Sequence, residues 1–71
     1  MVLDYTIRLR ELRDESGNTQ QEIAEVLGTS QTMYARYERS ANELPIRHLV
    51  TLAQYYDVSC DYLLGLTESR K

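Results

Sequence analysis

Helix-capping signals occur twice within the stretch "TQQEIAEVLGTSQTMYARYER", residues 19–39. Thr19 and Glu22 form the pattern T-x-x-E, in which each side chain can bond the other residue's backbone N–H, and an apolar run follows directly. Gly28 is typical of a helix end, because glycine readily adopts the left-handed conformation found there. Ser30 can cap the helix that follows. The stretch therefore predicts two short helices joined by one tight turn.

Three further helices are expected around this pair, from apolar residues at helical spacing. The first runs from Asp4, as its N-cap, to Ser16. Pro45 is expected at or near the first position of the fourth, where its missing N–H costs nothing. The short fifth segment "CDYLL" begins after Ser59 and ends at Gly65. The apolar faces of the helices are predicted to consist of Ile7, Leu9, Leu12, Ile23, Ala24, Val26, Leu27, Met33, Tyr34, Tyr37, Ile46, Leu49, Val50, Leu52, Ala53 and Tyr56.

No segment alternates with the period of a strand, so the predicted fold class is all-α, with five helices sharing one core. Because 71 residues are too few for two domains, residues 1–71 are interpreted as one domain with a core at 4–65 and a tail at 66–71. A single cysteine, Cys60, and a single histidine, His48, supply neither a disulfide nor a zinc site. No cofactor, metal or small-molecule ligand is expected. The chain has no leader-like or membrane-spanning pattern, which predicts a soluble cytoplasmic protein.

Two helices around a glycine turn match the general helix-turn-helix pattern, which many small helical domains share. Four sequence motifs are more specific: T-Q-x-E-[apolar]-A at 19–24, L-G-x-S at 27–30, Y-E-R at 37–39 and V-S-x-D-Y-L-L-G at 58–65. Together they closely resemble the phage-repressor and Cro family of helix-turn-helix proteins. The resemblance covers about residues 9–65. It implies a compact, lambda-repressor-like fold of five helices and binding to double-stranded DNA.

The resemblance also implies which side chains contact DNA. The positions that project into the major groove in the family are Gln31, Thr32 and Arg36. Their chemistry suits base reading, because glutamine can bond adenine bidentately and arginine can bond guanine bidentately. The positions that face the phosphate backbone are Gln20, Ser30, Arg39 and Asn42. Gln20 opens the second helix, where free N–H groups already favour an anion.

Glu38 is interpreted as structural, because its family counterpart pairs with an arginine from the first helix. Arg13 occupies the matching position, so the pair is predicted to join the first and third helices from behind. The chain departs from the family at Asn18, where an apolar residue usually precedes the helix cap. It also has Ser40 and Ala41 where relatives commonly have glycine and a basic residue, which lowers the charge of the loop that grips phosphate.

The formal net charge of −3 opposes binding to a polyanion. Residues 29–47 nevertheless hold three arginines and two glutamates, a balance of +1. Because affinity depends on the number of neutralised phosphates, one copy is expected to bind weakly. A homodimer with its third helices about 34 Å apart in successive major grooves would double the contacts. The exposed residues predicted to form the dimer contact are Val58, Cys60, Tyr62, Leu64 and Leu66.

These features predict a sequence-specific DNA-binding regulator of transcription, with repression favoured, that reads an inverted repeat. Two alternatives remain: an antitoxin that regulates its own operon, and a protein-interaction module on the same fold without DNA binding. An enzyme is not expected, because no nucleophile, base and acid are spaced for catalysis. His48 is expected to be solvated on the fourth helix, and the default interpretation of Cys60 is a small apolar residue.

Overall fold

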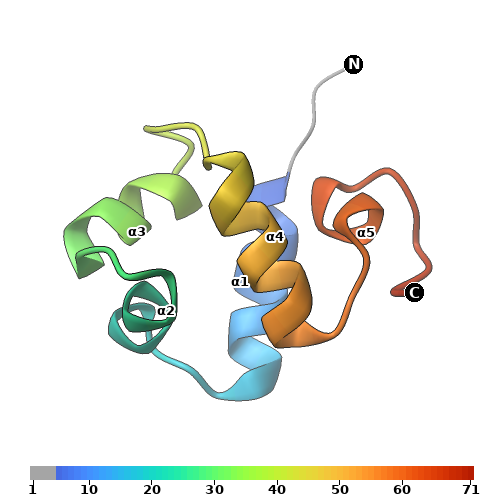
Figure 1. Cartoon of the computed structure of the whole chain (residues 1–71), viewed down its shortest axis with the longest axis horizontal. Coiled ribbons are helices and arrows are strands. Elements are labelled where there is room, and N and C mark those ends of the chain that lie inside the picture. The colour runs from blue at the N-terminus through green and yellow to red at the C-terminus, as the bar shows by residue number, and fades with distance from the viewer. Residues whose placement is uncertain (1–4) are drawn as a thin grey trace.

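The computed structural model describes residues 5–71, and Figure 1 shows their helices packed around one another. The helices are α1 (Tyr5–Ser16), α2 (Gln20–Leu27), α3 (Gln31–Glu38), α4 (Ile46–Tyr56) and α5 (Cys60–Leu64). This part of the chain has no strand, and the predicted all-α, five-helix fold class is confirmed. The N-cap predicted at Asp4 lies outside the described residues. Among residues 5–71, none of the helices is both long and apolar enough to cross a membrane.

The helix ends around the first turn form as the capping signals predict. Thr19 Oγ1 accepts a hydrogen bond from the Glu22 N–H at 3.1 Å, and the Glu22 carboxylate accepts from the Thr19 N–H at 2.8 Å. Gly28 ends α2 with a φ of 71°, in the left-handed region. Ser30 Oγ then accepts from the Met33 N–H at 3.1 Å. Local chemistry therefore fixes both ends of the turn between α2 and α3.

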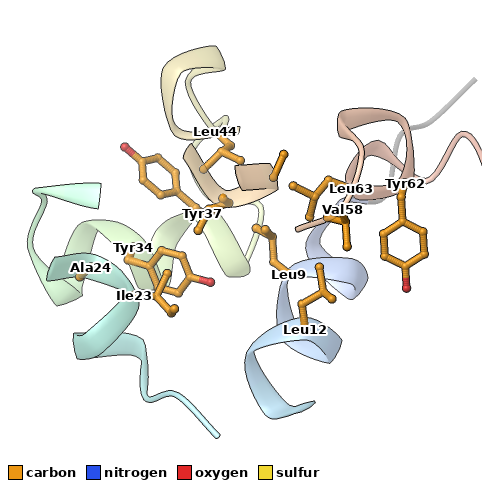
Figure 2. Close-up of a cluster of buried hydrophobic side chains, with 12 residues drawn as sticks. Leu9, Leu12, Ile23, Ala24, Tyr34, Tyr37, Leu44, Val58, Tyr62 and Leu63 are labelled. Atoms are coloured by element: carbon orange, nitrogen blue, oxygen red, sulfur yellow. The ribbon is translucent and has the colours of Figure 1, made fainter. Parts of the chain in front are cut away.

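Every helix contributes at least one large side chain to the core, as Figure 2 shows for most of them. The largest fully buried residues are Leu9 from α1, Ile23 from α2, Tyr34 from α3, Leu52 from α4 and Leu63 from α5. Burial of such side chains stabilises by about 1.5–3 kcal/mol each. A single core shared by all five helices therefore holds the helix-turn-helix in place.

Four members of the predicted apolar faces are exposed, so their predicted burial is wrong. Ile7, Val26, Ile46 and Val50 have exposed fractions of 45%, 37%, 77% and 41%. In a chain this small, each helix is covered by its neighbours on one narrow side only, and apolar residues beyond that side remain in solvent. Helical spacing identifies the apolar stripe of a helix, but it does not show how much of that stripe the neighbouring helices cover.

The prediction that His48 is solvated is also wrong. His48 is buried on α4, with its ring edge-on to Tyr37 of α3 at 5.8 Å between centroids. Burial, with a smaller contribution from neighbouring Arg47, lowers the pKa of His48 below its usual value. Pro45 lies at the N-cap of α4, directly before its first position, in agreement with the prediction. Within α4, His48 and not Ile46 faces the core.

The C-terminal end of the chain folds back on α1 and α5. The Ser59 N–H donates to the Arg70 carbonyl at 2.7 Å. Glu68 pairs with Arg8 at 3.3 Å and Arg70 pairs with Glu15 at 2.7 Å. Residues 66–71, predicted to be a tail, are thus tied to the domain by several polar contacts.

Candidate nucleic-acid interface

The helix-turn-helix places one side of α3 against the core and the other in solvent. Tyr34 and Tyr37 point inward and are buried, as predicted. The base-reading candidates Gln31, Thr32 and Arg36 are all exposed on the opposite side. Since α3 packs against both α1 and α2, its outer face is presented by a fixed scaffold.

The candidates for phosphate contact surround this face. Ser30 and Arg39 are exposed at the two ends of α3. Asn42 is half-buried in the loop after α3, where its amide nitrogen lies 3.7 Å from the Met33 sulfur. Gln20 is half-buried at the start of α2. Of these four residues, Gln20 contacts Gln31 of α3 and Asn42 contacts Met33 of α3, while Ser30 and Arg39 flank the helix directly.

The ion pair predicted behind α3 is present. Arg13 Nε lies 2.7 Å from Glu38 Oε2, and Arg13 Nη2 donates to Glu38 Oε1 at 3.2 Å. The Glu38 side chain is only 3% exposed. A buried carboxylate is stable only when it is well paired. This pair therefore ties α1 to the end of α3, as the family pattern implies.

Glu38 also has two partners that the sequence reasoning missed. The Tyr34 hydroxyl donates to Oε2 at 2.6 Å, and the Gln20 amide donates to Oε1 at 3.0 Å. Burial acts to raise the pKa of Glu38, but the hydrogen bonds from Arg13, Tyr34 and Gln20 outweigh it and hold that pKa below its usual range. Tyr34 and Glu38 are four residues apart on one helix, and this spacing could have suggested their contact. No sequence signal points from Glu38 to Gln20.

Gln20 continues the network to the outer face of α3. Its side-chain carbonyl accepts a hydrogen bond from the Gln31 amide at 2.8 Å. A chain of hydrogen bonds thus runs from the buried carboxylate of Glu38, through a half-buried amide, to an exposed candidate for base reading. Gln20 is predicted to meet phosphate, and here it also connects the core to the surface.

The two departures from the family pattern have visible consequences. Asn18 Oδ1 accepts from Ser16 at 2.7 Å and from the Tyr55 hydroxyl at 3.1 Å. These polar contacts join the start of α2 to α1 and α4, where the family uses an apolar staple. Ser40 takes a φ of 61°, a left-handed conformation that costs a residue with a side chain about 1–2 kcal/mol.

The exposed charge around α3 is basic. Glu38 is buried against Arg13, so the exposed charged residues between 29 and 47 are Arg36, Arg39, Glu43 and Arg47. Three cations and one anion are a favourable set for a polyanion, in a chain whose total charge is −3. The negative charge that opposes DNA therefore lies on other parts of the molecule.

The predicted apolar cluster near α5 is largely not exposed. Val58 and Tyr62 are buried, with exposed fractions of 9% and 4%, which overturns their predicted exposure. The Arg8 guanidinium covers the Tyr62 ring at 4.1 Å from its centroid. Cys60 and Leu64 are half-buried, and Leu66 is 49% exposed. Two predicted members of the cluster, Val58 and Tyr62, belong to the hydrophobic core instead.

A helix-turn-helix with an exposed polar and basic face on its second helix defines a class of DNA-binding domain. The chain belongs to the helix-turn-helix family of the Cro/C1 type, whose model, described as "Helix-turn-helix", matches residues 9–63. This family consists of transcriptional regulators, a DNA-binding and non-enzymatic class.

Several relatives carry this class in their names. An uncharacterized HTH-type transcriptional regulator of Bacillus subtilis, YobD, is 44% identical over 64 residues, which cover 90% of this chain and 57% of that protein. The HTH-type transcriptional regulator ImmR of the same organism is 41% identical over 64 residues, covering 90% of this chain and 50% of that protein. The chain spans about half the length of the curated relatives it matches.

The same fold occurs in a solved structure. The crystal structure of a transcriptional regulator from Listeria innocua matches with a TM-score of 0.88 at 28% identity, covering 97% of this chain and 64% of that one. The predicted resemblance and the five-helix architecture are both confirmed by this match.

Proposed function

We propose that the chain binds double-stranded DNA sequence-specifically, as a transcriptional repressor that reads an inverted repeat through the major groove. The observation that carries the proposal is the division of α3 into a buried tyrosine side and an exposed side with Gln31, Thr32 and Arg36. Amide, hydroxyl and guanidinium groups are the ones that read base edges. Membership in a family of DNA-binding regulators supports the same conclusion.

The side chains divide into two roles. Gln31, Thr32 and Arg36 contact base edges, and the phosphate contacts come from Gln20, Ser30, Arg39 and Asn42. Arg36 bonds guanine bidentately, because its guanidinium presents two parallel donors to two acceptors. Arg39, at the C-cap of α3, neutralises a phosphate and contributes equally on every sequence.

A homodimer on DNA follows from the shortage of positive charge. One copy offers three exposed arginines between residues 29 and 47, which is few for stable binding at physiological salt. Two copies with α3 about 34 Å apart would double both base and phosphate contacts. Of the predicted dimer residues, Cys60, Leu64 and Leu66 retain exposed surface, and we assign the contact to them. A chain that stays monomeric on a palindromic target would contradict this assignment.

Selection of bound sequences from a random duplex pool, at stated salt, tests the proposal. We expect an inverted repeat with half-sites one helical turn apart. Arg36→Ala should cost about 1–3 kcal/mol and relax one position per half-site, whereas Arg39→Ala should mainly reduce the salt dependence. Arg10→Ala, an exposed arginine on α1, is the matched control and should leave the selected sequence unchanged. Absence of binding to any duplex at low salt would favour a protein-interaction module.

A further inference from the structure

The Glu38 carboxylate accepts hydrogen bonds on both of its oxygens. Oε2 accepts from Arg13 and from the Tyr34 hydroxyl, while Oε1 accepts from Arg13 and from Gln20. The side chain is buried against a permanently charged guanidinium, so it stays ionised. An ionised carboxylate has no hydrogen to donate. Whatever group faces Oε1 must therefore be a donor.

This requirement decides the orientation of two amides in turn. Gln20 must point its NH2 group toward Glu38, at 3.0 Å, which leaves its carbonyl facing Gln31. Since a carbonyl only accepts, Gln31 must point its own NH2 group inward, at 2.8 Å. Either amide alone could rotate by half a turn at little cost. Linked to a buried carboxylate, each has one satisfied orientation.

The orientation of Gln31 determines what it offers to DNA. One hydrogen of its NH2 group is used by Gln20. Its carbonyl oxygen and its second amide hydrogen remain, which make one acceptor and one donor. In the major groove, adenine presents an acceptor and a donor, while guanine presents two acceptors. A Gln31 held in this orientation matches adenine and mismatches guanine.

We propose that Glu38 is a positioning residue that fixes the Gln31 amide through Gln20, and thereby sets a preference for adenine over guanine at the base pair that Gln31 reads. This inference rests on the proposed DNA-binding function. Glu38 itself does not touch DNA. Its role in specificity comes from the absence of a hydrogen on Oε1, and its role in stability comes from the pair with Arg13.

Glu38→Gln is the direct test, because an amide at this place can present either an oxygen or an NH2 group to Gln20. When the NH2 group of the substituted residue 38 faces Gln20, the amides of Gln20 and Gln31 must both rotate. Gln31 then offers two donors to DNA, which suit guanine. The measurement is the ratio of affinities for two duplexes, one with adenine and one with guanine at the base position that Gln31 reads. That position is identified as the one at which Gln31→Ala loses its base preference. A good bidentate contact discriminates by about five- to 150-fold. We expect the wild-type ratio in this range and the variant ratio near one.

Tyr34→Phe is the matched control, because it removes a donor to Oε2 but leaves the contact between Oε1 and Gln20. It should lower stability and keep the wild-type ratio. A ratio is informative here because a purely structural defect weakens binding to both duplexes equally. If Glu38→Gln does not fold, Gln20→Met replaces it: the pair of Glu38 with Arg13 stays intact while Gln31 is released, and the ratio should again approach one.

The outcomes separate this inference from the proposed function. A wild-type protein that binds no duplex overturns both. A second outcome overturns the role of Glu38 alone. In that outcome the wild type binds DNA and Gln31→Ala loses the preference for adenine over guanine, but folded Glu38→Gln or Gln20→Met keeps it. A wild-type preference for guanine at this position also overturns it, because the observed orientation of Gln31 cannot satisfy two acceptors.

Discussion

The helix-turn-helix and the C-terminal end of the chain are both tied to α1 by charge pairs, but the two sets of pairs are of opposite kinds. Arg13 of α1 meets Glu38 in a buried, multiply hydrogen-bonded site. Glu15 of α1 meets Arg70 with both side chains about half exposed. Breaking a buried pair leaves an uncompensated charge, while an exposed pair contributes about 0–1 kcal/mol. The charge pair on the side that we assign to DNA therefore contributes more to stability than the exposed pair at the C-terminal end.

The largest expected effect is at the buried pair. Arg13→Ala leaves the Glu38 carboxylate buried without its cation, and should lower the free energy of unfolding by about 3–5 kcal/mol. Urea denaturation at neutral pH measures this loss. Arg10→Ala, on the exposed side of the same helix, is the control and should change little. A loss for Arg13→Ala as small as for Arg10→Ala would remove the contrast between the two sides.

Two equivalent helix caps, one on each side, give the next comparison. Thr19 caps α2 and Ser59 caps α5, each by accepting from a backbone N–H at 3.0–3.1 Å. Thr19→Ala and Ser59→Ala should each cost about 1 kcal/mol in stability. Only Thr19→Ala should also weaken DNA binding, because it loosens the first turn of α2, which carries Gln20. Equal effects of both variants on DNA affinity would contradict the division of the molecule.

The success of the capping predictions and the failure of others have one physical cause. Capping depends on residues three apart, so Thr19 and Ser30 could be assigned from the sequence. Burial depends on which side of a helix its neighbours cover. For this reason Ile46, predicted on the apolar face, is exposed, and His48, predicted to be solvated, is buried. The predicted pair of Arg13 and Glu38 came from the family pattern. The link from Glu38 to Gln20 needed the angle between α2 and α3, which no local spacing contains.

Acid should weaken the helix-turn-helix side first, through His48. Burial beside Tyr37, with Arg47 adjacent, lowers the pKa of His48 below its ordinary 6.5. The folded state therefore binds fewer protons than the unfolded state, and this contribution to stability is present above pH 6.5 and is lost as the pH falls through the folded pKa. The carboxyl groups with lowered pKa values begin to respond only below their ordinary 4.5.

Denaturation midpoints measured between pH 6.5 and 4.5 test this assignment. The wild-type midpoint should fall across this interval, and the midpoint of His48→Gln should stay nearly constant, because its side chain does not titrate. If the midpoint of His48→Gln falls with pH as steeply as that of the wild type, another titrating group governs stability in this pH range.

The smallest effect is expected at the C-terminal end. Arg70→Ala removes the exposed pair with Glu15 and the contact of the Arg70 guanidinium with the Tyr62 ring, 5.4 Å from its centroid, but keeps the backbone bond from the Ser59 N–H to the Arg70 carbonyl. The loss in stability should be below about 1 kcal/mol at low salt, and the part due to the ion pair should nearly vanish at about 1 M salt, where charges are screened within about 3 Å. Urea denaturation of wild type and variant at both salt concentrations measures the difference. A loss above about 2 kcal/mol that persists at high salt would mean that this end is anchored by packing, since exposed ion pairs do not reach that size.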